Sequence, residues 1–251
     1  MIVEDEVYLD KLTIKPNDVF KLIDDGIHPS STQPEPIRVR TLLEDLVDKY
    51  DSLIVITVSA KLSGTNKEAQ ALSKEGYKIS VIDSCLNSGA QGLIVKKAAE
   101  LINQDLTHEA IVEALIDMSK RSKIYVCLNT LDYAVAGVRV PDTVGKIGKL
   151  LHMRPIMSLD EEGKGIAFGV GFSQKGMTKK IYKLVSKTLK DKGIMSYSIV
   201  HSNNDELASQ YIKDLSVMVG KAPEFVSEIS SIVAMHSGPG CVAVSFISEK
   251  R

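Results

Sequence analysis

Four short segments of the chain carry most of the side chains that could hold or transform a small molecule. They are residues 30–34, 62–65, 83–84 and 236–240, and each is rich in hydroxyls or glycine. Hydroxyls and free backbone N–H groups donate hydrogen bonds, and His236 adds a ring that titrates near neutral pH. Such groups suit the binding of a small anion better than the breaking of a bond.

Segment 62–65 (Leu-Ser-Gly-Thr) lies between a predicted strand and a predicted helix. The strand, residues 53–58, is a continuous apolar, β-branched run, which is typical of a strand buried in a parallel sheet. Ligands of open parallel sheets bind at the carboxyl ends of strands, where the next helix also offers N–H groups to an anion. Asp83 and Ser84 take the same position after the following strand. Both segments could equally be ordinary turns that cap a helix.

Two prolines stiffen the segment that contains Ser31 and Thr32. Pro34 and Pro36 fix the backbone angle φ and remove two N–H donors, so the neighbouring hydroxyls can be held in one geometry. The alternative is a helix-entry loop in which these hydroxyls serve as caps. Ser31 and Thr32 are therefore candidate ligand-binding residues.

The most distinctive segment is the last, in which His236 comes shortly before a Gly-Pro-Gly turn and an apolar strand. Two glycines and a proline favour a tight turn, which would fix the orientation of the histidine. A single histidine is more often a surface or core residue than a functional one, but this setting favours a role for His236. The other four histidines lack such a setting.

Several enzyme classes lack their sequence signatures. No G-x-G-x-x-G follows a predicted strand, no G-x-S-x-G elbow is present, and no H-E-x-x-H or carboxylate cluster suggests a metal. A segment that begins at Gly171 resembles a phosphate loop, but Met177 stands where the lysine should be. We therefore expect no cofactor and no metal, and we assign no catalytic residue.

Composition and charge exclude other partners. The 251 residues carry a formal net charge of −1 and few aromatics, which gives no attraction to nucleic acid and no platform for base stacking. No apolar run approaches the ~20 residues that span a bilayer, and the acidic start is unlike a signal peptide. Three widely spaced cysteines without a C-x-x-C pair argue against disulfides and zinc. These features predict a cytoplasmic protein without nucleic acid partners or stable membrane insertion.

The first half of the chain alternates apolar, β-branched runs with segments of helical period. We predict strands at residues 53–58 and 79–82, and helices at residues 16–25, 40–50, 66–74, 88–104 and from a cap at Thr107 onward. Strands that alternate with helices argue for βαβ units and a mostly parallel sheet.

The pattern changes after a polar junction at residues 119–123. We predict strands at residues 124–128, 195–200 and 242–247, a strand or hairpin within 163–171, and helices around 143–151, 175–190 and 205–219. A mixed sheet covered by helices accounts for this order. We therefore expect a two-domain α/β fold, with a parallel-sheet α/β/α domain at residues 1–122 and a mixed-sheet α/β domain at residues 123–251.

Taken in order, these segments resemble the motifs of the DegV family of bacterial fatty-acid-binding proteins. The family pattern has a Thr-Ser-Gln-Pro-Ser loop, a Ser-Gly-Thr loop, a Val-Ile-Asp-Ser strand end with Gly-Gln-Gly, a Leu-x-x-Leu…Gly-Gly-Arg-Ile segment, a Lys-Pro-Ile strand and a terminal His-x-Gly-Pro-Gly. The corresponding residues here are 31–35, 63–65, 81–84 with 90–92, 128–131 with 136–140, 154–156 and 236–240. Six motifs in order over essentially the whole chain form a specific match.

The resemblance implies that a long-chain fatty acid lies between the two domains. Its carboxylate would be held by the hydroxyls of Ser31 and Ser63, while His236 helps to organise the site. The resemblance marks further ligand-binding positions at Thr32, Gly64, Thr65, Arg139 and Gly238. Some members of the family present the carboxylate to a separate, ATP-using kinase subunit that makes acyl-phosphate. The chain would then be a non-enzymatic lipid-binding subunit whose partner is a fatty acid kinase.

The chain departs from the family pattern at several positions. Ser31 replaces a threonine and keeps the hydroxyl, whereas Glu35 replaces a serine and brings a negative charge near the expected carboxylate. Val138 replaces a glycine next to Arg139. We also expect the first domain to lack the family's opening strand, which ends in Asp-Ser, and a missing strand would expose a sheet edge.

Two other functions stay open from the sequence. Ser31 or Ser63 could be the nucleophile and His236 the base of a hydrolase or acyl transferase, which would require a third group to orient the histidine. Alternatively, a family member whose pocket no longer binds lipid could act as an interaction module. Glu35 and the absent opening strand would favour that last function.

Overall fold

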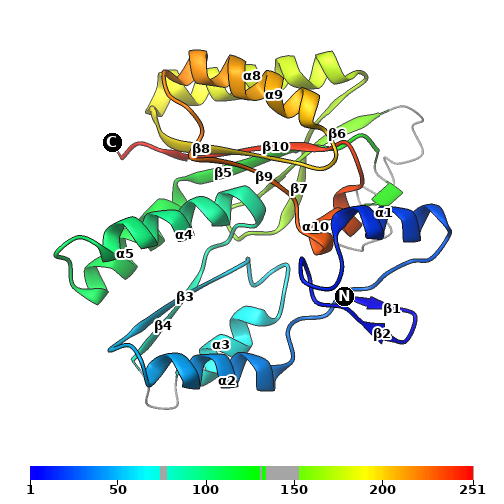
Figure 1. The fold of residues 1–251 in the computed structure, drawn as a ribbon. Coiled ribbons are helices and arrows are strands. Elements are labelled where there is room, and N and C mark those ends of the chain that lie inside the picture. Colours follow the sequence, from blue (N-terminus) through cyan, green and yellow to red (C-terminus); the bar gives the residue numbers. More distant parts are fainter. Residues whose placement is uncertain (74–77, 131, 134–152, 251) are drawn as a thin grey trace.

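A six-stranded mixed sheet forms the centre of the larger part of the molecule (Figure 1). In the computed structural model, which describes residues 1–73, 78–130, 132–133 and 153–250, its strands lie in the order β7-β6-β5-β10-β8-β9. Neighbours run antiparallel except for β8 and β9, which are parallel. The strands are β5 (Ser122–Cys127), β6 (Arg154–Leu159), β7 (Gly165–Gly171), β8 (Ile194–His201), β9 (Phe225–Glu228) and β10 (Val242–Ser248).

Strand β10 divides the core of this sheet in two. All its residues are buried, and they alternate: Ala243 and Ile247 belong to a cluster on one face, whereas Val244 and Phe246 belong to a cluster on the other. Side chains along a strand alternate with period two, so a strand covered on both faces needs a nearly continuous apolar run. The covering helices are α4 (Ser88–Ile102) and α5 (His108–Lys120) on the first face, and α8 (Gln174–Lys192) and α9 (Asp205–Val219) on the second (Figure 1).

A smaller, parallel sheet of two strands lies below α4 in Figure 1. Its elements are β3 (Leu53–Thr57) and β4 (Ile79–Asp83), with α2 (Pro36–Val47) and α3 (Thr65–Ser73). Leu53 and Ile79 form a core with α2 and α3 on one face of this sheet. Ile54 and Ile56 of the opposite face pack against the core cluster of the larger sheet and stay only partly buried. The side chains of β3 are therefore less buried than the sequence predicted for a strand covered on both faces.

The N-terminal segment packs against the end of the chain. Its elements are β1 (Ile2–Val3), β2 (Glu6–Val7) and α1 (Pro16–Asp24), and its partner is α10 (Ser231–Ser237). Asp10 Oδ1 accepts a hydrogen bond from the Ser231 N–H at 2.7 Å, and Ser231 Oγ donates to the Ile14 carbonyl at 2.9 Å. Such contacts cross the domain division that the sequence predicts at residues 122 and 123, and that division stays a prediction.

A histidine fastens the smaller sheet to α5. His108 contacts Ser52 Oγ through Nδ1 at 2.9 Å and Ser80 Oγ through Nε2 at 2.7 Å. Ser52 directly precedes β3, and Ser80 lies in β4, so both strands are tied at their amino ends. Sequence reasoning assigned His108 no role, because its two serine partners are distant in the chain.

The α/β fold class predicted from the sequence is confirmed, with a parallel sheet and a mixed sheet. Most predicted helices and strands occur within a few residues of their expected ends, although α2 begins at Pro36 instead of residue 40. The cap at Thr107 is present, since its Oγ1 accepts from the Ala110 N–H at 3.2 Å. Strands β1, β2 and β9 and helix α10 were not predicted. The helix expected at residues 143–151 lies outside the described residues.

Helix α4 approaches the six-stranded sheet closely at its first turn. A Cβ atom on Gly89 would stand 2.8 Å from Ser198 Oγ and 2.9 Å from both Ser245 Oγ and Val200 Cγ2. Ser198 Oγ also donates a hydrogen bond to the Gly89 carbonyl at 3.2 Å. A glycine on the helix and serines on the strands therefore let the two backbones come together.

We predict that Gly89→Ala destabilises the protein, although alanine is normally the better helix residue by about 1 kcal/mol. The added methyl would overlap side chains whose backbone is held in strands, and overpacking of this kind costs about 1–3 kcal/mol. Urea unfolding followed by circular dichroism measures the change. Gly169→Ala is the control, because nothing lies within 4 Å of a Cβ atom there. Equal stability of the two variants would contradict the close contact.

Candidate functional site

Hydrogen bonds fasten the loops that follow β3 and β4 to each other. The Ser59 N–H donates to the Leu86 carbonyl at 2.8 Å. The Asp83 carboxylate accepts from the Ala60 N–H at 3.2 Å and from the Cys85 N–H at 2.9 Å. Asp83 therefore holds loop backbone, which is one of the roles that its position after a strand allows.

Ser63, Gly64 and Thr65 form the end of the first loop and the start of α3. Ser63 Oγ accepts from the Thr65 N–H at 3.2 Å and lies 2.9 Å from Thr65 Oγ1. All three residues are half-buried. Within a pair of hydroxyls, one O–H donates to its neighbour and the other O–H is left to donate elsewhere. The pair thus satisfies the first N–H group of α3 and leaves one O–H that can donate to another group.

Gln33 brings the Ser31-Thr32 segment onto this loop. Its side-chain oxygen lies against Gly64 so closely that a Cβ atom there would overlap it, and its Nε2 donates to Glu68 Oε1 at 3.2 Å. Ser31 is half-buried, whereas Thr32 is exposed and donates to the Gln33 carbonyl at 2.9 Å. The first two of the predicted segments therefore meet in space.

Glu35, whose charge the sequence places near the expected carboxylate, pairs with a neighbouring arginine. Its carboxylate forms an ion pair with Arg38, with Nε and Oε2 separated by 3.0 Å, and both side chains are more than half exposed. Water screens an exposed pair strongly. The charge of Glu35 is therefore directed to Arg38 and to solvent.

His236 and Gly238 lie at the end of α10. His236 is in the last turn of α10, and Gly238 ends that helix with φ of 69°. Ser202 Oγ donates to the Gly238 carbonyl at 3.0 Å, and the ring of Tyr133 lies directly against the Gly238 Cα. The turn that the sequence predicts after His236 is present at residues 239–240, and His236 itself lies in a helix that is capped by Ser230 Oγ.

Packing connects α10 with the loop after β4. Ala234, two residues before His236, belongs to the same buried cluster as Leu86. The loops that follow β3 and β4, which we call the hydroxyl loops, thus share one apolar core with α10, although they are distant from it in the chain. Arg139, the remaining predicted site residue, lies outside the described residues.

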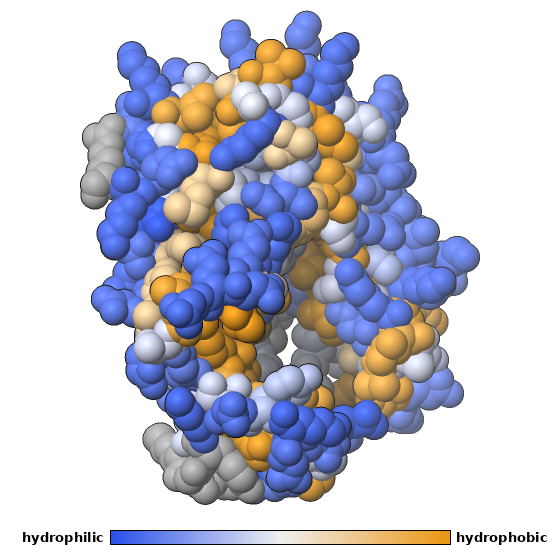
Figure 2. All heavy atoms as spheres, turned by 60° about the vertical axis from the view of Figure 1, so that its left-hand side comes forward, coloured by the Kyte–Doolittle hydropathy of each residue, from blue (hydrophilic) through white to orange (hydrophobic). Residues whose placement is uncertain are grey.

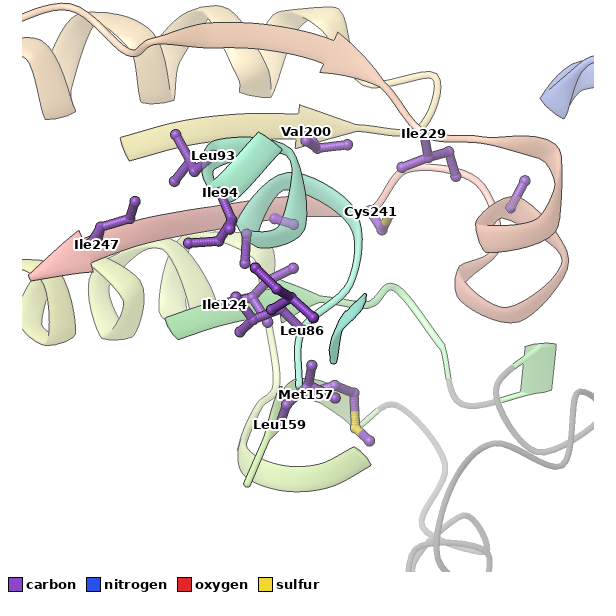
Figure 3. Close-up of a cluster of buried hydrophobic side chains, with 14 of the residues drawn as sticks. Leu86, Leu93, Ile94, Ile124, Met157, Leu159, Val200, Ile229, Cys241 and Ile247 are labelled. Atoms are coloured by element: carbon purple, nitrogen blue, oxygen red, sulfur yellow. The ribbon is translucent and has the colours of Figure 1, made fainter. Parts of the chain in front are cut away.

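The apolar core next to these loops is incompletely covered. In Figure 3, Leu86 and Ile124 are followed by Met157 and Leu159 of β6 toward the bottom of the view. Partly buried hydrophobic residues complete this cluster on the side of the smaller sheet: Ile54, Ile56 and Leu62. Figure 2 shows the molecule hollowed between its upper and lower parts, with apolar side chains beside the hollow. The loop after β3 therefore contacts a partly covered apolar core through Leu62.

Sequence reasoning missed three residues of this arrangement. Gln33 joins two loops, and Ser59 and Gly163 join the loop after β3 to the turn between β6 and β7. The position of Ser59 at the end of β3 was a signal that could have identified it. Gly163 gave no such signal, because 104 residues separate it from its partner.

The described part of the chain has neither a metal-binding cluster nor a membrane-spanning helix. Among residues 1–73, 78–130, 132–133 and 153–250, no group of three His, Cys, Asp or Glu side chains could hold a metal ion. Within the same residues, no helix is long and apolar enough to cross a membrane.

These loops and sheets define an α/β protein whose candidate site combines small hydroxyls at strand ends with an apolar interior. A family model described as uncharacterised proteins of the DegV family matches residues 1–249. The chain belongs to the DegV family, as the order of its motifs indicates.

Relatives and solved structures agree with this assignment. A DegV domain-containing protein of Clostridium perfringens is 31% identical over 99% of this chain and 89% of its own length. DegV of Bacillus subtilis, described as a fatty acid binding protein, superposes with a TM-score of 0.87 at 26% identity, over 99% of this chain and 89% of its own. A DegV lipid-binding protein of Thermotoga maritima gives a TM-score of 0.82 at 27% identity, over 100% and 89%.

The three cysteines differ sharply in their surroundings. Cys127 and Cys241 are buried, and burial raises the pKa of their thiols to about 12 and about 11. Cys85 is half-buried beside the candidate site, and burial together with the Asp83 carboxylate raises the pKa of its thiol as well. The thiolate is the reactive form of cysteine.

We predict that a chromogenic disulfide reagent at pH 8 labels only Cys85 in the native protein, and slowly. Rates should increase as the pH rises toward the raised pKa of this thiol. All three cysteines should react in urea, and a Cys85→Ala variant should show no native labelling. Because unfolded thiols ionise at lower pH than the buried ones, stability should fall as the pH rises above about 9. Native labelling of Cys127 or Cys241 would contradict their burial.

Proposed function

We propose that the chain binds a long-chain fatty acid between its two sheets and presents the carboxylate to a separate kinase subunit. The observation that carries this proposal is the contact between the hydroxyl loops and a partly covered apolar core. Leu62 illustrates it, because it packs against that core and directly precedes Ser63. A ligand with one anionic end and a long apolar body fits such a site.

The carboxylate end would be held chiefly by hydroxyls. Ser31, Ser63 and Thr65 supply small neutral donors, and Thr32 would supply another if its O–H turned away from the Gln33 carbonyl. Hydrogen bonds to a charged acceptor are stronger than neutral ones. The proposed site also includes Gly64, His236, Gly238 and Arg139. Held in this way, one carboxylate oxygen stays open to attack the terminal phosphate of ATP bound by the partner, with ADP leaving and acyl-phosphate forming.

The acyl chain would supply most of the affinity. Each buried CH₂ group contributes roughly 0.8 kcal/mol, so a long chain can offset the cost of ordering a flexible ligand. Ile54, Ile56 and Leu62 are candidates for its surroundings, because they face the larger core and remain partly exposed. The protein would act in the cytoplasm as a binding subunit, with residues 1–122 and 123–251 as its two domains.

The contacts of Ser63 favour binding over hydrolysis. Its hydroxyl is paired with Thr65, whose hydroxyl is not a general base at neutral pH. A serine nucleophile needs a base within hydrogen-bond reach.

Mass spectrometry of chloroform extracts from the denatured recombinant protein should find about one fatty acid per chain, and delipidated protein should bind added palmitate or oleate. If the protein neither carries a fatty acid nor binds added palmitate or oleate, the proposal is wrong.

We predict that Ser63→Ala and His236→Ala each weaken binding of palmitate more than binding of methyl palmitate. Loss of a hydrogen bond to a charged group costs about 1.5–3 kcal/mol, or roughly 10- to 150-fold in affinity. Isothermal titration calorimetry of delipidated protein measures both ligands. Ser209→Ala, which changes an exposed residue of α9, should bind like the wild type. Equal losses for acid and ester would argue against carboxylate recognition.

A further inference from the structure

We infer that the turn at residues 160–164, between β6 and β7, positions the hydroxyls of the carboxylate site by way of Ser59. This inference rests on the proposed function and deepens it, because it names residues of the six-stranded sheet that set the geometry of a site on the smaller sheet. Ser59 and Gly163 are positioning residues in this account. Neither needs to touch the ligand.

The link between turn and loop is a buried hydrogen bond. Ser59 is fully buried, and its Oγ donates to the Gly163 carbonyl at 2.8 Å. Gly163 has φ of 81°, and a Cβ atom there would overlap Ser59 Oγ and stand 2.8 Å from Cys85 Cα. The turn therefore touches the loops after both β3 and β4 through a position where a side chain has no room.

The turn itself is held in one geometry. Asp160 Oδ1 accepts from the Glu162 N–H at 3.0 Å and from the Lys164 N–H at 2.9 Å. The Gly163 N–H donates back to the Asp160 carbonyl at 3.2 Å. A carboxylate that satisfies successive backbone donors fixes a turn in this way. The Gly163 carbonyl is thus presented to Ser59 from a rigid support.

Ser59 transmits this position to the candidate ligand hydroxyls. Its carbonyl accepts from the Leu62 N–H at 2.9 Å and from the Ser63 N–H at 3.2 Å. Its Oγ also accepts from the Lys61 N–H at 3.1 Å. Ser63 Oγ then contacts Thr65 Oγ1 at 2.9 Å. Displacement of Ser59 would therefore shift the hydroxyl pair.

A second contact between turn and loop is electrostatic and weaker. Lys61 Nζ lies 3.5 Å from Glu162 Oε2, with the side chains 54% and 75% exposed. Exposed pairs contribute little because water screens them. The buried bond of Ser59 is therefore the one that we expect to control ligand geometry.

The test compares palmitate with methyl palmitate in Ser59→Ala and Gly163→Ala proteins. Ser59→Ala removes the hydrogen bond without adding atoms, whereas Gly163→Ala pushes the turn away from the loop. We expect each variant to lose about tenfold or more in affinity for palmitate, as for a lost charge-assisted hydrogen bond, with less than about a twofold change for the ester. A variant that only deformed the apolar space would weaken both ligands.

Gly26→Ala is the matched control for Gly163→Ala. Gly26 has a similar φ of 82° but nothing within 4 Å of a Cβ atom, so it carries the backbone cost without the contact. Gly26→Ala should leave both affinities unchanged. Wild-type palmitate affinity in both positioning variants, or equal losses for acid and ester, would overturn this inference. Failure of the wild type to bind palmitate would instead overturn the proposed function.

Discussion

The close packing of α4 on the six-stranded sheet is the constraint on which the rest of the molecule depends. Gly89 and the serines beneath it bring the helix backbone down to the strands, and Leu93 and Ile94 then become fully buried. The same helix reaches the smaller sheet, where Gln91 Nε2 donates to the Ile56 carbonyl at 3.2 Å. One helix therefore contacts both sheets and helps to set the distance between them.

Polar contacts hold the smaller sheet at both ends of its strands. His108 ties the amino ends through Ser52 and Ser80, and the bond of Ser59 to Gly163 ties the carboxyl end of β3. Between these polar contacts, the smaller sheet meets the larger core through apolar side chains that are only partly buried. A ligand placed there would meet hydroxyls at one edge and hydrocarbon along its length. This arrangement of polar and apolar groups is consistent with the fatty acid binding that we propose and with membership of the DegV family.

Strongly patterned elements were predictable, and weakly patterned ones were not. Strand β10 is a continuous apolar run, and α9 carries a helical period over its whole length, so both were located nearly to the residue. Helix α10 was not predicted, because it has seven residues and too few turns to show a helical period, whereas the turn at Gly238-Pro239-Gly240 that follows it was predicted. Strands β1 and β2 have two residues each and exist by pairing with each other, which no local pattern signals.

The sequence by itself determined the fold class, the family and the types of side chain at the ends of β3 and β4. Hydrophobic period and loop composition are local properties, and they survive in any conformation of the chain. Only the tertiary structure decided that Gln33 lies on Gly64 and that Ser59 meets Gly163. Those contacts depend on how two sheets are spaced and turned, and that geometry arises from the packing of α4 instead of from any residue's immediate neighbours.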